Sequence, residues 1–112
     1  MKVFEAGCNA DQKHATVEGG ANAVSSITIA ANANEFWVLD HLTFSANETP
    51  AANTTLTIAI GSTTVFKHFL TAAGVGPIPL GALATGVKNE AVTITASAAG
   101  GTAKVNFSIV YR

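Results

Sequence analysis

The sequence alternates hydrophobic and polar residues with a period of two along much of its length. In the last segment, apolar residues occupy every second position from Ala103 to Tyr111, and polar residues occupy most positions between them. Successive side chains of a strand point to opposite faces, so this pattern is typical of a half-buried β-strand. No stretch shows a long apolar stripe at helical spacing. The chain is therefore predicted to be all-β.

The clearest hairpin has its turn at Gly61-Ser62, between two alternating segments. Glycine in the first position suits a type II′ turn of two residues. Such a turn sets Phe66 opposite Thr57 and His68 opposite Thr55, so Phe66 and His68 are predicted to lie on a face of threonines. A large apolar ring on that face is left in solvent unless a partner covers it. We therefore expect a protein contact at Phe66.

Further strands follow from the same pattern, and a second hairpin is predicted at the C-terminal end. Its turn is Ala99-Gly100-Gly101, where glycine supplies the positive φ of a tight turn. Other strands are predicted at residues 2–5, 14–18, 23–31, 36–45 and 77–80. Short strands separated by about 8–12 residues predict an antiparallel two-sheet sandwich with jelly-roll or related Greek-key topology. Residues 23–112 are expected to form this single domain, preceded by an N-terminal arm or edge strands at residues 1–22.

The segment 36–45 carries apolar residues on both faces, which predicts a central strand buried on both sides. Asp40 interrupts one apolar face, so its carboxylate must find a hydrogen-bond partner or lie at an edge. Asp40 beside His41 looks like part of a catalytic relay. Adjacent side chains of a strand point to opposite faces, however, and the two are not expected to act together on one substrate atom.

The longest link between predicted strands, residues 71–90, is rich in glycine and contains Pro77 and Pro79. Proline cannot donate to a β-ladder, so residues 77–80 are predicted to be a short edge strand. This link is expected to contact a partner, together with the N-terminal arm and the Phe66 face. The predicted contact residues are Thr55, Thr57, Phe66, His68, Val75, Pro77, Ile78 and Pro79.

The composition adds an argument about partners. Only 12% of the residues are charged, the formal net charge is −1, and alanine, threonine, glycine, asparagine and serine make up more than half of the chain. Six scattered bases do not form a phosphate-binding surface, so no nucleic-acid partner is expected. Most charges fall at strand ends or in links, which leaves sheet faces of threonine, alanine and serine. Sheet faces without charged side chains, which would otherwise oppose association, predict permanent packing against other subunits.

No set of residues indicates an enzyme, a metal or a cofactor. The histidines His14, His41 and His68 are 27 residues apart, and no His-x-His or His-x-Asp pair gives the usual spacing of two metal ligands. The sequence also lacks a nucleophile elbow, a phosphate-binding glycine loop and a carboxylate pair. The single cysteine, Cys8, cannot form an internal disulfide and is expected to be an inert thiol. We predict a non-enzymatic protein without metal or cofactor.

Two features bear on secretion and membranes. The N-terminal residues lack the apolar segment of a signal peptide, so the chain is expected to be made and kept soluble. Residues 68–87 contain no Asp, Glu, Lys or Arg, but their glycines and two prolines would break a membrane-spanning helix. No membrane partner is expected.

Four stretches of the sequence carry a resemblance to a known family. They are the strand from Trp37 to Ser45, the hairpin 54–66, the loop 72–80 and the closing strand 100–111. In texture and order they resemble the small β-sandwich decoration, or cement, proteins encoded beside phage head genes, such as the jelly-roll staple of the epsilon-fifteen type phage head. The resemblance carries over no functional residue.

That resemblance implies a virion structural protein that binds the outer surface of a capsid across subunit boundaries. The implied partner is the major capsid protein, and the implied state on the capsid is a homo-oligomer, either a dimer or a trimer. Synthesis in the host cytoplasm would precede assembly onto the virion.

An alternative function follows from the aromatic residues. Trp37, Phe66 and Tyr111 are candidates for a platform on which sugar rings stack, although packing in the core is the simpler fate of Trp37 and Tyr111. This alternative is a carbohydrate-binding β-sandwich module of a phage tail or adhesin.

Overall fold

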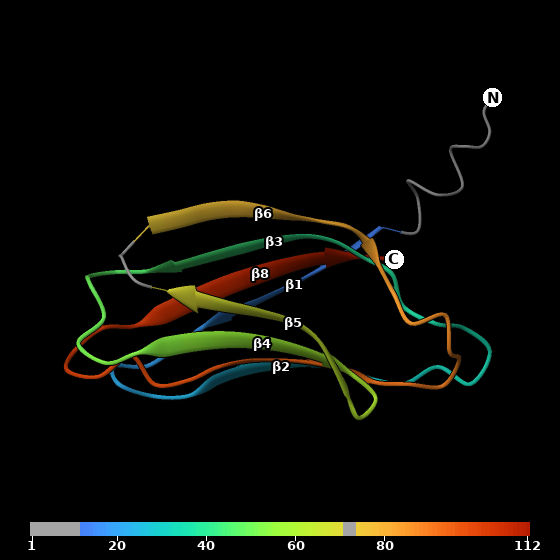
Figure 1. Cartoon of the computed structure of the whole chain (residues 1–112), viewed down its shortest axis with the longest axis horizontal. Helices are drawn as coiled ribbons and strands as arrows, with labels where there is room; N and C mark the ends of the chain where they lie inside the picture. Colours follow the sequence, from blue (N-terminus) through green and yellow to red (C-terminus); the bar gives the residue numbers. More distant parts are fainter. Residues whose placement is uncertain (1–11, 71–73) are drawn as a thin grey trace.

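Two antiparallel sheets of four strands each lie one above the other in the computed structural model, which describes residues 12–70 and 74–112 except for the side chains of 74–76 (Figure 1). Sheet A has the strand order β1-β8-β3-β6, and sheet B has the order β2-β7-β4-β5. The strands are β1 (Lys13–Glu18), β2 (Ser25–Ile29), β3 (Leu39–Ala46), β4 (Thr54–Ile60), β5 (Thr63–Leu70), β6 (Gly74–Leu83), β7 (Val92–Ala96) and β8 (Val105–Tyr111). The predicted all-β sandwich is confirmed. None of the described residues belongs to a helix able to cross a membrane.

The strand order is that of a jelly roll. The first strand pairs with the last, β2 with β7, β3 with β6 and β4 with β5, all antiparallel. The described chain is therefore one long hairpin that folds over on itself, and the added pairs β3–β8 and β4–β7 complete the two sheets. This arrangement resolves the predicted choice between jelly-roll and related Greek-key topologies.

The core lies between the two sheets and is built from the alternate positions of the strands. In β4, β7 and β8, buried and half-buried residues follow each other with a period of two. The largest fully buried side chains are Phe44, Phe107, Leu39, Leu42, Leu56, Ile58, Ile60, Ile94 and Ile109. The burial of apolar surface, which contributes about 25 cal/mol of free energy per Å², is the main term that stabilises such a core.

The β4–β5 hairpin forms with its turn at Gly61-Ser62, but a bulge changes its register. Ala59 pairs with Thr64 and Ile58 pairs with Phe66, so Val65 is an extra residue in β5. A shift of one residue moves every later side chain to the opposite face. The predicted placement of Phe66 on the threonine face is therefore wrong, because Phe66 pairs with the fully buried Ile58 and packs against the core.

The bulge predicts an unusual tolerance to deletion. Removing Val65 leaves Thr64 opposite Ala59 and Phe66 opposite Ile58 in a continuous ladder, so we expect a loss of less than about 2 kcal/mol of unfolding free energy. Strand β7 pairs on both sides without a bulge. Removing Thr95 from it moves the side chains on one side of the deletion to the opposite face of the sheet, and this is expected to prevent folding. Thermal unfolding of the two deletion variants measures the difference. Equal loss in both variants would contradict the observed register.

The predicted C-terminal hairpin is wrong. Strand β7 lies in sheet B and β8 lies in sheet A, so residues 97–104 cross between the sheets instead of turning back within one. Gly100 and Gly101 do have positive φ values, of 78° and 56°. The conformational signal was therefore correct, but a crossing loop uses the same left-handed glycines as a tight turn.

Strand β3 is central in sheet A but is not buried on both sides as predicted. Leu39, Leu42 and Phe44 are fully buried between the sheets, whereas His41 and Thr43 are exposed on the outer face. The segment before Leu39 is not a strand. Sheet A therefore covers the core with one face only, as antiparallel sheets commonly do.

The edges of sheet A are β1 and β6. The prediction of an edge strand around the two prolines is confirmed, although β6 extends over Gly74–Leu83 and so begins earlier and ends later than expected. Residues 13–18, from the predicted arm, form strand β1 along β8. The remaining residues of that arm, up to 11, and the predicted strand at 2–5 lie outside the described residues.

Candidate functional site

An interruption of two β-ladders opens a hollow at one end of sheet A. Asp40 has no partner in β8, because Leu39 pairs with Tyr111 and His41 pairs with the next residue, Val110. On the other side, His41 pairs with Pro79 and Leu39 with Leu83, so three residues of β6 stand opposite Asp40 alone. Such bulges separate strands locally and redirect side chains.

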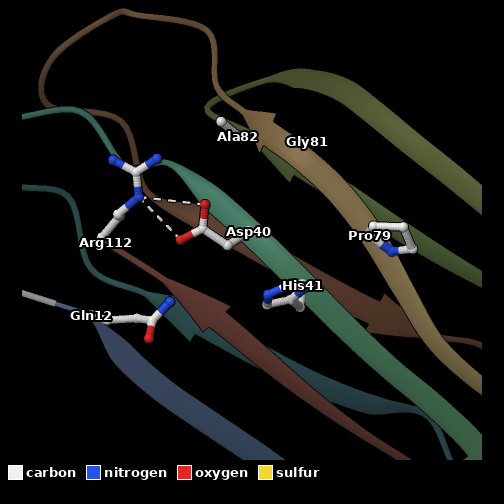
Figure 2. A pocket seen from close by; sticks show the side chains of 7 residues that line it. All are labelled: Gln12, Asp40, His41, Pro79, Gly81, Ala82 and Arg112. Atoms are coloured by element: carbon white, nitrogen blue, oxygen red, sulfur yellow. Dashed lines mark hydrogen bonds and ion pairs between the residues drawn. The ribbon is translucent and has the colours of Figure 1, made fainter. Parts of the chain in front are cut away.

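This hollow, which we call the bulge hollow, has a volume of about 480 Å³ and lies on the outer side of sheet A near the C-terminus. Its lining residues are Gln12, Asp40, His41, Pro79, Gly81, Ala82 and Arg112. Figure 2 shows Asp40 and Arg112 on one side, His41 at the centre, and the end of β6 across from them. Gly81 and Ala82 have positive φ values of 64° and 60°, a conformation that is uncommon for alanine.

The charges of the bulge hollow are paired with each other. Arg112 Nε donates to both carboxylate oxygens of Asp40, at 3.1 Å to Oδ2 and 3.4 Å to Oδ1. The side chain of Asp40 is 15% exposed and that of Arg112 is 38% exposed. Of the two predicted alternatives for Asp40, a hydrogen-bond partner or an edge position, the structure shows the partner: it is Arg112, which also exchanges two backbone hydrogen bonds with Val38.

The bulge also corrects the expectation for Asp40 and His41. The two side chains line the same hollow, whereas a regular strand would separate them onto opposite faces. Sequence alternation could not reveal this, because the irregularity appears only in the pairing of β3 with its two neighbours.

The three histidines do not converge. His14 and His41 lie on the outer face of sheet A, where both pair with Val110 from opposite sides. His68 lies in sheet B, and its ring meets two phenylalanine rings. It is edge-on to Phe44, with 6.2 Å between the ring centroids, and stacked on Phe66, with 6.3 Å between the centroids. Within residues 12–70 and 74–112, no group of three or more His, Cys, Asp or Glu side chains is placed to hold a metal ion. Cys8 lies outside the described residues.

The predicted contact residues are divided among several surfaces. Phe66 and His68 point toward the core, and Ile78 is half-buried against it. Pro77 and Pro79 are exposed at the β6 edge of sheet A. Thr55 and Thr57 lie on the outer face of sheet B. The backbone of Val75 belongs to β6, and its side chain lies outside the described part of the chain.

On strands β2, β7 and β4, the outer face of sheet B is a surface of small hydroxyl and methyl groups, and the exposed Lys67 of strand β5 borders it. Thr57 lies between Thr95 and Lys67, and Thr95 lies between Thr57 and Ser26. We call this surface the threonine face; its residues are Ser26, Thr28, Thr55, Thr57, Ala59, Thr93 and Thr95. None of these seven residues is charged.

The exposed aromatic ring beside the threonine face is Phe69. The bulge at Val65 brings Phe69 opposite Thr55, and its side chain is 63% exposed. A hollow of about 320 Å³ adjoins it, lined by Asn53, Thr54, Phe69 and Leu70. The sequence prediction placed Phe66 on this face and was wrong; the bulge at Val65 places Phe69 there instead.

The predicted aromatic platform is not assembled. Trp37 is half-buried: its Nε1 donates to the carbonyl of Ala30 at 3.0 Å, and its ring meets Tyr111 edge-on at 5.5 Å. The Nζ of Lys13 lies 5.8 Å from the centre of the Trp37 ring, at cation–π distance. Phe66 is in the other sheet and faces the core. The three rings therefore share no common surface.

Comparisons with known proteins identify the fold. No protein-family model and no curated protein sequence matches the chain. Among solved structures, it is similar to the CBM36-1 domain of a multidomain xylanase from the hindgut metagenome of Trinervitermes trinervoides, with a TM-score of 0.55 and 11% identity over 90% of this chain and 95% of that one.

Two further structures give the same result. The carbohydrate-binding module CBM36 in complex with calcium and xylotriose has a TM-score of 0.52 and 12% identity over 89% of this chain and 87% of that one. The Drosophila NLP-core, described for pentamer formation and histone binding, has a TM-score of 0.51 and 12% identity over 89% of this chain and 95% of that one. At these identities the likeness shows a shared β-sandwich fold, and one fold serves many functions.

Proposed function

We propose that the protein is a non-enzymatic virion structural protein that binds the outer surface of a phage capsid and stabilises the lattice by bridging subunits. The observation that carries this proposal is the threonine face with the exposed Phe69 beside it. The resemblance of the sequence to phage decoration proteins supports the capsid as the lattice. The major capsid protein is then the partner, and a homo-oligomer on the virion is the working state.

The threonine face suits a permanent protein contact for physical reasons. Interface cores are depleted in charged residues, because a buried charge without a partner loses its hydration. The seven residues of the face need no such compensation, and their methyl groups contribute apolar area. Phe69 adds an aromatic anchor at the edge of the face, and the neighbouring hollow is a place for a partner side chain.

This proposal predicts that one charge at the centre of the threonine face strongly weakens capsid binding. Thr95→Lys and Thr95→Glu are both expected to weaken binding at least about 30-fold, because either charge would lose its hydration in the contact, and Lys67, the one charged residue on the strands of sheet B, is separated from position 95 by Thr57. Purified protein is mixed with undecorated capsids and co-sedimented, and the rupture temperature of the capsids is then measured. The wild-type protein is expected to bind and to raise that temperature.

Matched controls lie on the outer face of sheet A. Thr43 is exposed at the centre of that sheet, between Ser108 and Pro77, so Thr43→Lys and Thr43→Glu place the same charges on the other side of the molecule. We expect these variants to bind capsids like the wild type. The proposal fails if the wild-type protein neither binds nor stabilises capsids, or if the Thr95 variants bind as tightly as the Thr43 variants.

Carbohydrate binding is the second candidate function. The shared fold with the CBM36 domains supports it, and the specific observation in its favour is the bulge hollow, which gathers polar side chains in a concave site. The predicted ring platform of Trp37 and Phe66 does not support carbohydrate binding, because the two rings do not lie together. Trp37 packs against Tyr111 of sheet A, whereas Phe66 belongs to sheet B and packs against the core. Glycan-array binding by the purified protein tests this function directly.

A further inference from the structure

We infer that the bulge hollow is a binding site for an uncharged saccharide unit. The inference deepens the second candidate function and rests on it, since it names the site and the class of ligand. It is independent of capsid attachment, because the bulge hollow is on the side of sheet A and the threonine face lies on the outer side of sheet B.

The first step is the supply of hydrogen-bonding groups. Arg112 uses its Nε toward Asp40, and its two terminal nitrogens have no partner within the described part of the chain. The side chains of His41 and Gln12 likewise make no hydrogen bond to another described residue. These groups offer donors and acceptors together, and the carboxylate of Asp40 adds further acceptor positions. Figure 2 shows all four side chains gathered around one opening.

The second step is the charge of the site. Asp40 and Arg112 neutralise each other as an ion pair, so the hollow has no net charge when His41 is neutral. An anion would gain from Arg112 but would be repelled by Asp40, and a cation would experience the reverse. An uncharged ligand with neighbouring hydroxyls avoids both repulsions, because each hydroxyl donates to the carboxylate while accepting from the guanidinium or the imidazole.

The third step is the shape and the apolar part of the site. The volume of about 480 Å³ lies within the range of about 300–1,000 Å³ that small-molecule sites occupy. Pro79, which Figure 2 shows across from the ion pair, and Ala82 also line the hollow and supply C–H groups that suit the apolar face of a sugar ring. The ion pair is fixed by two contacts from one guanidinium nitrogen, so its carboxylate is already oriented before a ligand arrives.

The test begins with a glycan array of neutral oligosaccharides and continues by titration of the best ligand into the wild-type protein. His41→Ala and Arg112→Gln are each expected to weaken binding at least about tenfold, the effect of losing one hydrogen bond to a charged or well-placed partner. His14→Ala is the matched control. It removes the same imidazole from the same outer face on the other side of Val110, outside the hollow, and should change the affinity by less than about twofold. Thermal unfolding of each variant confirms that the fold is kept.

The outcomes separate the site from the function. If no neutral glycan binds at millimolar concentration, both carbohydrate binding and the inferred site are overturned. If a glycan binds but His41→Ala and Arg112→Gln leave its affinity unchanged, carbohydrate binding stands and the site is overturned. A sialylated or uronate ligand that binds more tightly than its neutral counterpart overturns the inferred ligand class.

Discussion

Phe44→Ala is expected to lower the free energy of unfolding by about 3–5 kcal/mol. The side chain of Phe44 is fully buried between the sheets, and its ring meets the ring of His68 edge-on at 6.2 Å. Truncation to alanine loses the transfer free energy of the ring and leaves a cavity that the neighbouring strands fill only in part. A domain of this size has a total stability of about 5–15 kcal/mol, so the loss is a large fraction of it.

The matched control for Phe44 is the same substitution at a surface ring. Phe69 is 63% exposed, and Phe69→Ala is expected to change stability by less than about 0.5 kcal/mol. Phe66→Ala should fall between the two, because Phe66 is half-buried against the core. Urea unfolding of the three variants measures the order. If Phe69→Ala costs more than Phe66→Ala, the bulged register of β5 is refuted.

Gly19→Ala is expected to have the second large effect, a loss of about 2–4 kcal/mol. Gly19 lies just after β1, where the chain crosses from sheet A to sheet B. Its N–H donates to the carbonyl of Val105 at 3.0 Å, and a Cβ at this position would lie 2.6 Å from that same oxygen and would also overlap the hydroxyl of Ser25. Because Val105 O belongs to the backbone of β8, the crowding is relieved only by moving the corner and weakening the hydrogen bond.

The neighbouring glycine provides the control. A Cβ on Gly20 would meet only the Cβ of Ala23, at the ordinary contact distance of 3.7 Å. Gly20→Ala is therefore expected to be neutral or to stabilise the protein by up to about 1 kcal/mol, through a lower entropy of the unfolded chain. Thermal unfolding of the Gly19→Ala and Gly20→Ala variants measures the difference in stability. Similar melting temperatures for the two would show that close packing at Gly19 does not limit stability.

The proposed function and the inferred site divide the molecule between its two outer faces. The threonine face of sheet B has no charged residue, whereas the bulge hollow beside sheet A contains an ion pair and two polar side chains without described partners. We propose that the first attaches the protein to a lattice and that the second remains open to a glycan. The Thr95, Thr43, His41 and His14 variants test these roles separately, because each substitution changes one face only.

Much of the fold followed from local sequence pattern. The period-two alternation correctly predicted an all-β sandwich and the β4–β5 hairpin, and Pro77 and Pro79 correctly predicted an edge strand. These properties are local, because they depend on the alternation of side chains along one strand and on the N–H groups that proline lacks. The pattern also predicted that Asp40 has a hydrogen-bond partner or lies at an edge, and the structure shows Arg112 as the partner.

The candidate sites were decided by contacts between segments far apart in the chain. Whether β7 returns to β8 or crosses to the other sheet depends on the strands that each one meets, and the glycines of the link allow both. The bulges at Val65 and Asp40 exist only relative to neighbouring strands, yet one exposes Phe69 in place of Phe66 and the other brings Asp40 and His41 into one hollow. The sequence by itself determined where most strands lie, although not the ends of β3 and β6, because alternation is a local property. The tertiary structure alone determined which side chains share a surface, because strand pairing and register depend on contacts between distant segments.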